Sequence, residues 1–167
     1  MMTSKDGLYN LKTVKDQANA NNAVAAINAD FFSWDGTGFG YPIGFTMKDG
    51  EVTSSAYYKN ATKDTMATFL LDAKNSPLYK YMKMESATIS NGNGESIDVA
   101  EINKISGDYL TPVIFTPEFN STSPGNSKLW DMVEFVVEDG KLKEVRDCKV
   151  GATIPKDGYV ICARLDN

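Results

Sequence analysis

The sequence contains no histidine and only two cysteines, and both shortages exclude kinds of site. Without histidine there is no Ser-His-Asp or Cys-His nucleophile pair and no histidine-ligated zinc. Acid–base chemistry must therefore use carboxylates, Tyr, Lys or water. Cys148 and Cys162 are too few and too far apart in sequence for a zinc knuckle. We expect two free, half-buried thiols, with a disulfide closing a loop of about 15 residues as the alternative.

The sequence also lacks an excess of basic residues and any long apolar run. It has 17 Lys and Arg residues against 22 Asp and Glu residues, for a net charge of −5. This balance argues against general binding to nucleic acid or to an anionic membrane surface. No apolar run approaches the roughly 18 residues of a membrane span. The first ten residues lack a signal-peptide pattern, so the protein is cytoplasmic or its export signal lies elsewhere.

The length and composition are those of one globular domain. With 167 residues, of which 42% are hydrophobic and 23% charged, the chain can bury roughly two-thirds of its unfolded surface.

The first third of the chain predicts a helix, a strand and a hairpin. Residues 13–22 favour a short helix, because Thr13 and Asp16 have the spacing of a capping box. The apolar run 23–28 (AVAAIN) predicts a buried strand. After a glycine-rich loop, residues 43–55 predict a hairpin that turns at Asp49-Gly50.

The rest of the sequence predicts mostly strands. Prolines 112 and 117 interrupt the predicted strand 108–119. Either this strand lies at a sheet edge or the prolines mark strand ends. The predicted strands are 65–72, 78–89, 108–119 and 159–165, with a hairpin at 131–147 that turns at Asp139-Gly140, while 96–104 is ambiguous between strand and helix. The predicted fold class is α+β, a mostly antiparallel or mixed sheet with one N-terminal helix packed on it.

Asp30 is the first candidate for a functional residue. A strand that ends at Asn28-Ala29-Asp30 places the side chains of Asn28 and Asp30 on one face. Next to Phe31 and Phe32 the carboxylate would be partly desolvated, which suits it to proton transfer, with Asn28 as its orienting partner. The alternative is structural, because Asn and Asp commonly bind loop N–H groups at strand ends.

The glycine-rich loop after Asp30 also allows two interpretations. Its glycines can serve turns with positive φ, or they can let backbone N–H groups approach an anion. No Gly-Lys-Ser/Thr follows, so the loop is not a P-loop.

The segments NAVAAINADFF and YPIGFTMKDGEV together resemble the signature of the phosphodiester glycosidase family, which includes N-acetylglucosamine-1-phosphodiester α-N-acetylglucosaminidase. The family pattern is an alanine-rich strand, Ile-Asn-Gly-Asp-Phe-Phe, a variable loop, Pro-x-Gly and an Asp-Gly hairpin. Ala29 replaces the glycine more common in the family. The matching residues are Ile27, Asn28, Asp30, Phe31, Phe32, Pro42, Gly44, Asp49 and Gly50.

The resemblance implies hydrolysis of a sugar-1-phosphodiester at the anomeric carbon, by a protein that is exported or on the cell surface. It implies Asp30 and Asn28 as catalytic residues. A second carboxylate, where the mechanism needs one, is expected in the second half of the family domain; Glu118 is the best local substitute, with a solvated loop residue as the alternative. The implied ligand is a carbohydrate or glycan-phosphate, and no cofactor is implied, although Asp30 could help to hold calcium. The implied substrate-binding residues are Phe31, Phe32, Gly38, Gly40, Tyr41, Pro42, Gly44 and Glu118.

Two parts of the family pattern are absent from the sequence, and one of them is the strand that usually precedes the helix. A Leu-Asp-Gly-Gly-Gly-Ser-like motif, which lies in the second half of family members, is absent. The resemblance therefore implies that residues 1–167 are one partial domain, whose exposed sheet edges a second copy could cover. The alternative function is a non-catalytic carbohydrate-binding or interaction module of the cell envelope. Its candidate stacking aromatics are Trp34, Phe39, Tyr41, Tyr57 and Tyr58.

Overall fold

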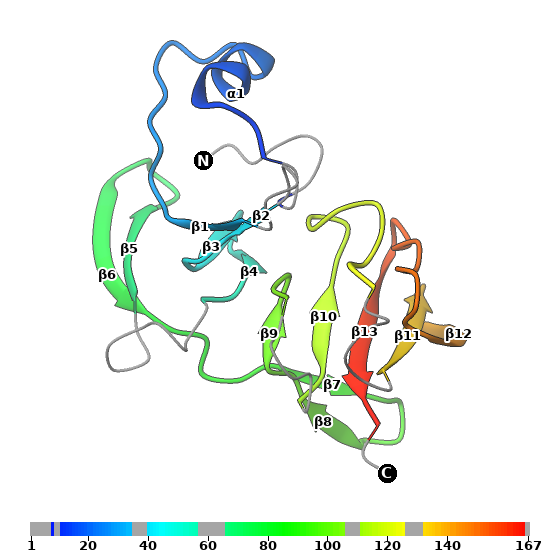
Figure 1. Cartoon of the computed structure of the whole chain (residues 1–167). Coiled ribbons are helices and arrows are strands. Elements are labelled where there is room, and N and C mark those ends of the chain that lie inside the picture. The colour runs from blue at the N-terminus through cyan, green and yellow to red at the C-terminus, as the bar shows by residue number, and fades with distance from the viewer. Residues whose placement is uncertain are drawn as a thin grey trace.

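The computed structural model describes residues 8, 11–34, 40–56, 66–105, 111–125 and 132–165. Within these ranges the protein is mostly β-structure with one short helix, as the predicted class requires (Figure 1). Four two-stranded hairpins accompany one five-stranded sheet in this described part.

The five-stranded sheet has the order β12-β11-β13-β10-β9. All neighbours in it are antiparallel except β9 and β10, which are parallel. Its strands are β9 (Glu101–Ile102), β10 (Val113–Phe115), β11 (Met132–Glu138), β12 (Lys141–Asp147) and β13 (Gly158–Arg164). The predicted hairpin at 131–147 and the final predicted strand are confirmed.

Two predicted Asp-Gly turns are confirmed by their backbone angles. Asp139 and Gly140 have φ values of 50° and 68°, and Asp49 and Gly50 have 52° and 88°. Positive φ at both central residues defines the type I′ turn, whose twist matches that of the flanking strands. The second turn joins β3 (Thr46–Lys48) to β4 (Glu51–Ser54).

The hydrophobic core lies on one face of the five-stranded sheet. Alternate residues of β11 and β13 point into it, since strand side chains repeat every two residues. The rings of Phe115 and Phe119 lie 4.8 Å apart in this core. Its buried members are Val113, Phe115, Phe119, Met132, Val136, Cys148, Ala152, Ile154, Val160 and Cys162.

Prolines 112 and 117 lie just outside β10 and therefore mark its ends. The ambiguous segment 96–104 forms strands rather than a helix, namely β8 (Ser96–Asp98) and β9. The strand predicted over 78–89 is divided into β6 (Pro77–Met82) and β7 (Thr88–Ser90). β6 pairs with β5 (Met66–Leu71), whereas β7 pairs with β8 across the Asn-Gly turn.

The buried strand predicted over residues 23–28 is wrong. This segment is extended but belongs to no strand, and the side chain of Ile27 is 85% exposed. Apolar composition favours a strand, but a strand also needs a neighbour to accept its backbone hydrogen bonds. No described strand pairs with residues 23–28.

The predicted helix is confirmed as α1 (Val14–Ala20), with Thr13 as its N-cap. Thr13 Oγ1 accepts from Asp16 N at 3.1 Å and donates to Asp16 Oδ2 at 2.7 Å. Unlike the expected packed helix, α1 has no buried residue and lies apart from the five-stranded sheet (Figure 1). No described helix is long and apolar enough to span a membrane.

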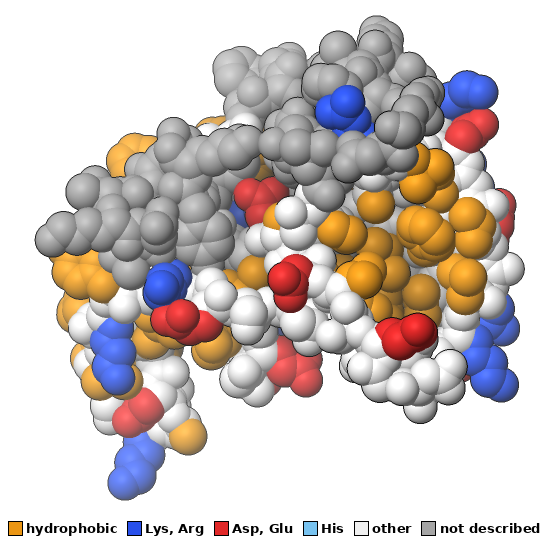
Figure 2. All heavy atoms as spheres, turned by 90° about the horizontal axis from the view of Figure 1, so that it is seen from below, with side chains coloured by type: hydrophobic (Ala, Val, Ile, Leu, Met, Phe, Trp, Pro, Cys, Tyr) orange, Lys and Arg blue, Asp and Glu red, His pale blue; other side chains and the backbone are white. Residues whose placement is uncertain are grey.

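Apolar side chains are exposed on two parts of the described surface. Figure 2 shows hydrophobic side chains in a hollow on the side of the molecule where the five-stranded sheet lies. Others are on the projecting β5–β6 hairpin, where Phe69 and Tyr79 contact each other at 5.2 Å between ring centroids. Exposed apolar surface of this kind favours association with another polypeptide.

Candidate functional site

Asp30 lies where the extended segment 23–30 meets β1 (Phe32–Trp34). Its Oδ1 accepts a hydrogen bond from Phe31 N at 2.7 Å, and its Oδ2 accepts one from Gly44 N at 2.8 Å. The side chain is exposed, as are those of Phe31 and Phe32. The predicted desolvation of Asp30 is therefore wrong, but both of its oxygens are held in place by backbone donors.

Residues 42–44 form a turn beside Asp30, and Gly44 is required for the close approach of this turn to Asp30. A Cβ atom at position 44 would lie 2.5 Å from Asp30 Oδ2. The glycine of the Pro-x-Gly motif thus permits the hydrogen bond that orients the carboxylate. Gly40 has a comparable role in β2 (Gly40–Pro42), because a Cβ there would lie 2.0 Å from the carbonyl oxygen of Ser33 on β1.

Lys104 holds the same turn from the interior. Its side chain is 0% exposed, and its Nζ donates to the carbonyl oxygens of Pro42 and of Gly44, the latter at 3.3 Å. The amine also lies 5.6 Å from the centroid of the Tyr41 ring, within range of a cation–π interaction. The turn is therefore held at Gly44 on both sides, through its N–H by Asp30 and through its carbonyl by Lys104.

The charge of Lys104 depends on two opposing effects. Burial lowers the pKa of Lys104 to about 7, although the carboxylates of Asp30 and Glu101 oppose this by favouring the protonated amine. Near neutral pH, the buried amine is consequently divided between its charged and neutral forms.

Asn103 anchors Lys104 to the five-stranded sheet. Its backbone has a φ of 55°, a left-handed conformation that Asn tolerates better than most residues. Its Nδ2 donates to Thr53 O on β4 and to Thr116 Oγ1 after β10, both at 2.7 Å, and its Oδ1 accepts from Thr116 N at 2.8 Å. Asn103, which directly precedes Lys104 in sequence, therefore connects its own segment to β4 and to the residues after β10.

Ser55 joins the β3–β4 hairpin to β9, which lies at the edge of the five-stranded sheet. Its backbone N–H donates to Ile102 O at 3.1 Å, and its hydroxyl accepts from Ile102 N at 3.0 Å. These bonds place β4 beside β9 and bring the 42–44 turn close to Lys104. The candidate site therefore depends on contacts between segments about 50 residues apart in sequence.

Glu118 is connected to the candidate site only indirectly. Its side chain is exposed, and its Oε2 accepts from Thr116 Oγ1 at 2.7 Å. Thr116 in turn contacts Asn103, so Glu118 is connected to the site through two intermediate side chains.

The remaining predicted residues are placed as follows. Asn28 is exposed in the extended segment, and the hydroxyl of Tyr41 donates to Ile105 O at 3.4 Å. Four of the predicted residues lie outside those the structure describes, or have side chains that it does not describe: Trp34, Phe39, Tyr57 and Tyr58. Gly38 also lies outside the described residues.

Sequence reasoning missed Lys104 and Asn103. Lysine is almost always at the surface, and nothing in the sequence EINKIS distinguishes a buried lysine from an exposed one. Burial of both residues follows only from the docking of β4 against β9.

The described acidic residues near Asp30 form no candidate metal site. Within the part of the chain that the structure describes, the one group of potential ligand residues is Glu134, Cys148 and Cys162. Asp30 is not a member of that group, so calcium binding at Asp30 gains no support from the geometry.

No protein-family model matches the chain, and no curated protein matches it. Solved structures do resemble it. A hypothetical protein from Synechocystis aligns with a TM-score of 0.76 and 18% identity, over 98% of this chain and 29% of that one. A protein from Burkholderia pseudomallei, named "Putative exported protein", aligns with a TM-score of 0.72 and 18% identity, over 95% of this chain and 37% of that one.

These likenesses show the fold, because the sequence identity is too low to carry more. The chain spans between 29% and 37% of the length of the two solved proteins. The same arrangement of strands therefore occurs in bacteria as part of considerably longer chains.

Proposed function

We propose that this chain supplies one wall of a glycosidase site that hydrolyses a sugar-1-phosphodiester at the anomeric carbon. The observation that supports this most directly is the geometry of Asp30. Its carboxylate is open to solvent while each oxygen is held by a backbone N–H group, from Phe31 and from Gly44. A carboxylate held in one orientation at a solvent-accessible position suits work on a bound substrate.

The chemistry of the leaving group makes a site without histidine workable. A departing phosphomonoester has a second pKa of about 6, so it needs far less protonation than a sugar alkoxide. The remaining tasks are to stabilise an oxocarbenium-like transition state and to direct a water molecule, and carboxylates perform both. Asp30 is the residue to which we assign this role.

Lys104 supports the position of Asp30 indirectly, through the 42–44 turn. It holds the 42–44 turn through two carbonyl groups, and the turn holds Asp30 through Gly44 N. Lys104 is buried, so we assign it a positioning role rather than contact with substrate.

A second candidate function is carbohydrate binding without hydrolysis. Phe31 is 80% exposed directly beside Asp30, and exposed aromatic rings can stack on sugar rings. We propose export for either function, on the basis of the signature and of the name of the Burkholderia pseudomallei neighbour.

The test compares the full product of the gene with its Asp30→Asn variant on a sugar-1-phosphodiester, measuring release of the phosphomonoester and, separately, ligand binding by calorimetry. We expect the substitution to lower kcat/KM by about 10²–10⁴-fold while binding persists. Asp98→Asn, which alters an exposed carboxylate on β8, is the matched control and should leave the rate unchanged. Equal rates for the wild type and the Asp30→Asn variant would remove the catalytic role of Asp30. Binding without turnover in the wild type would instead favour the binding module.

A further inference from the structure

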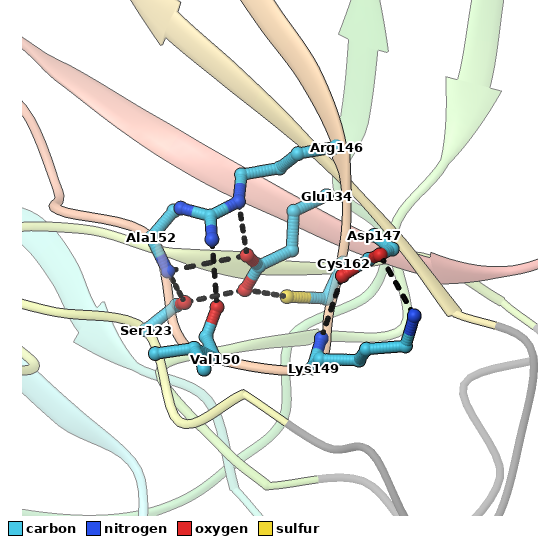
Figure 3. A network of polar contacts seen from close by, with 8 residues as sticks. All are labelled: Ser123, Glu134, Arg146, Asp147, Lys149, Val150, Ala152 and Cys162. Atoms are coloured by element: carbon cyan, nitrogen blue, oxygen red, sulfur yellow. Dashed lines mark hydrogen bonds and ion pairs between the residues drawn. The ribbon is translucent and has the colours of Figure 1, made fainter.

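A second polar cluster lies in the core of the five-stranded sheet, outside the candidate site. Its centre is Glu134 on β11, whose side chain is 0% exposed (Figure 3). Oε1 accepts from Ser123 Oγ and from Cys162 Sγ, the latter at 3.5 Å. Oε2 accepts from Ala152 N at 3.1 Å and lies 3.9 Å from Arg146 Nε. Every oxygen of this buried carboxylate therefore faces two donors.

Two cysteines meet at this cluster although 13 residues separate them in sequence. Cys162 is in β13, directly opposite Glu134 in the register of the sheet. Cys148 follows the edge strand β12, and its N–H donates to Met132 O at 3.1 Å. Both thiols are free and buried, and the two sulfur atoms and a Glu134 oxygen all lie within 4.8 Å of one another.

The donors around Glu134 argue against a metal ion in this cluster. A metal ligand must offer a lone pair, but the Glu134 oxygens already accept from a hydroxyl, a thiol and a backbone N–H. The guanidinium of Arg146 beside Oε2 would also repel a cation. The reactive part of the cluster is therefore the pair of thiols.

We propose that Cys148 and Cys162 are a cross-linking pair that forms a disulfide with a thiol–disulfide oxidant. One thiolate attacks the oxidant to give a mixed disulfide and releases a thiol. The second cysteine thiolate then attacks this mixed disulfide and releases the second thiol. The protein loses two protons and two electrons, and the electrons reduce the oxidant's disulfide to two thiols.

The cross-link requires the backbone to move, because Cys148 and Cys162 lie on opposite sides of β11 and neighbouring strands are about 4.8 Å apart. A disulfide has a sulfur–sulfur distance of about 2.05 Å, so the two sulfurs must approach by up to roughly 2.7 Å. Residues 148–150 form a bend directly after the edge strand, so the movement falls on this bend and breaks the hydrogen bond from Cys148 N to Met132 O. The bond would join the end of β12 to β13, across the intervening strand β11.

The surroundings of Cys162 determine when the bond forms. Its hydrogen bond with Cys148, burial and the nearby Glu134 carboxylate raise the pKa of Cys162. Because the attacking species is the thiolate, exchange is slow in the folded protein and faster while the chain is folding. The proposed export would place the chain where disulfides persist, although the chemistry of the pair does not depend on it.

The test refolds the reduced, denatured wild type in a buffer of glutathione and glutathione disulfide, followed by quenching with an alkylating reagent. We expect a single covalent chain whose mass is lower by two hydrogens and that carries no alkyl group, with a peptide that links positions 148 and 162. The oxidised form should have a Tm higher than the reduced form by roughly 5–10 °C. Cys148→Ala and Cys162→Ala should each take up one alkyl group and show no change of Tm with the oxidant.

The primary readout comes from the wild type, so it does not depend on whether the variants fold. A wild type that keeps two alkylatable thiols after refolding would overturn the proposal. So would accumulation of glutathione adducts or of disulfide-linked dimers. Retention of one equivalent of Zn²⁺ by the reduced wild type, lost in Cys148→Ala, would show a metal site in its place.

Discussion

At the scale of single residues, Lys104 shows how a buried charge can organise an exposed one. Its amine reaches no solvent, yet it holds the carbonyl groups of the turn that orients Asp30. Lysine provides three donors on a flexible stem, so one residue can hold two carbonyls. Its burial also makes the stability of the fold sensitive to pH.

Replacement of Lys104 by methionine should change the pH dependence of stability. Burial lowers the folded-state pKa of Lys104 to about 7 from its usual 10.5, so between these values the unfolded chain binds a proton that the folded chain does not. The free energy of unfolding therefore rises with pH across this window. We expect the wild type to show this rise and the Lys104→Met variant to lack it, in urea unfolding at several pH values between about 6.5 and 10.

The difference between the two proteins isolates Lys104 from other groups that titrate in this range. Parallel curves for the wild type and the variant would show that the amine titrates normally and is not buried as described.

At the scale of elements, the site depends on the junction between the β3–β4 hairpin and the five-stranded sheet. Asn103 is the central residue of this junction, because its amide contacts both β4 and the residue after β10. Ser55 adds a second connection to β9. Each bond is modest by itself, but the loss of a partner leaves a buried polar group unsatisfied.

Replacement of Asn103 by alanine should lower the free energy of unfolding by about 2–4 kcal/mol, because it leaves the buried carbonyl of Thr53 and the half-buried N–H of Thr116 without their partner. Asn75→Ala is the matched control. Asn75 has a similar φ of 60° but is exposed, so it reports the cost of the left-handed backbone alone. Equal losses for the two variants in denaturant unfolding would mean that the buried hydrogen bonds add nothing to stability.

At the scale of the whole molecule, the described surface exposes many large apolar side chains. One group is on the β5–β6 hairpin, which lies apart from the five-stranded sheet (Figure 1), and Figure 2 shows a second group in a hollow on the sheet side. The two solved neighbours are about three times as long as this chain.

We expect the chain by itself to associate with increasing concentration, measured by sedimentation velocity, because burial of this surface is favourable. Tyr79→Ser with Tyr81→Ser should shift the distribution towards the monomer, since both side chains are exposed on β6. Lys80→Ser, at the position between them, alters the other face of the same strand and should have no effect. A wild type that remains monomeric at every concentration would contradict this expectation.

The sequence was sufficient for features that arise from short-range chemistry. The Thr13 cap and both Asp-Gly turns follow from local backbone preferences, and the alternation in β11 follows from the two-residue period of a strand. The sequence failed over residues 23–28, because apolar composition alone cannot show whether a neighbouring strand is present.

The sequence by itself determined the type of most elements and the lack of histidine chemistry. It also indicated Asp30, the carboxylate in the segment that resembles the phosphodiester glycosidase signature. Only the tertiary structure decided that Lys104 is buried behind the 42–44 turn and that Cys148 meets Cys162 beside Glu134. Local preferences act within a few residues, whereas these contacts join positions separated by tens of residues or lying on different strands. Their formation depends on strand pairing and on the docking of β4 against β9, which no local pattern specifies.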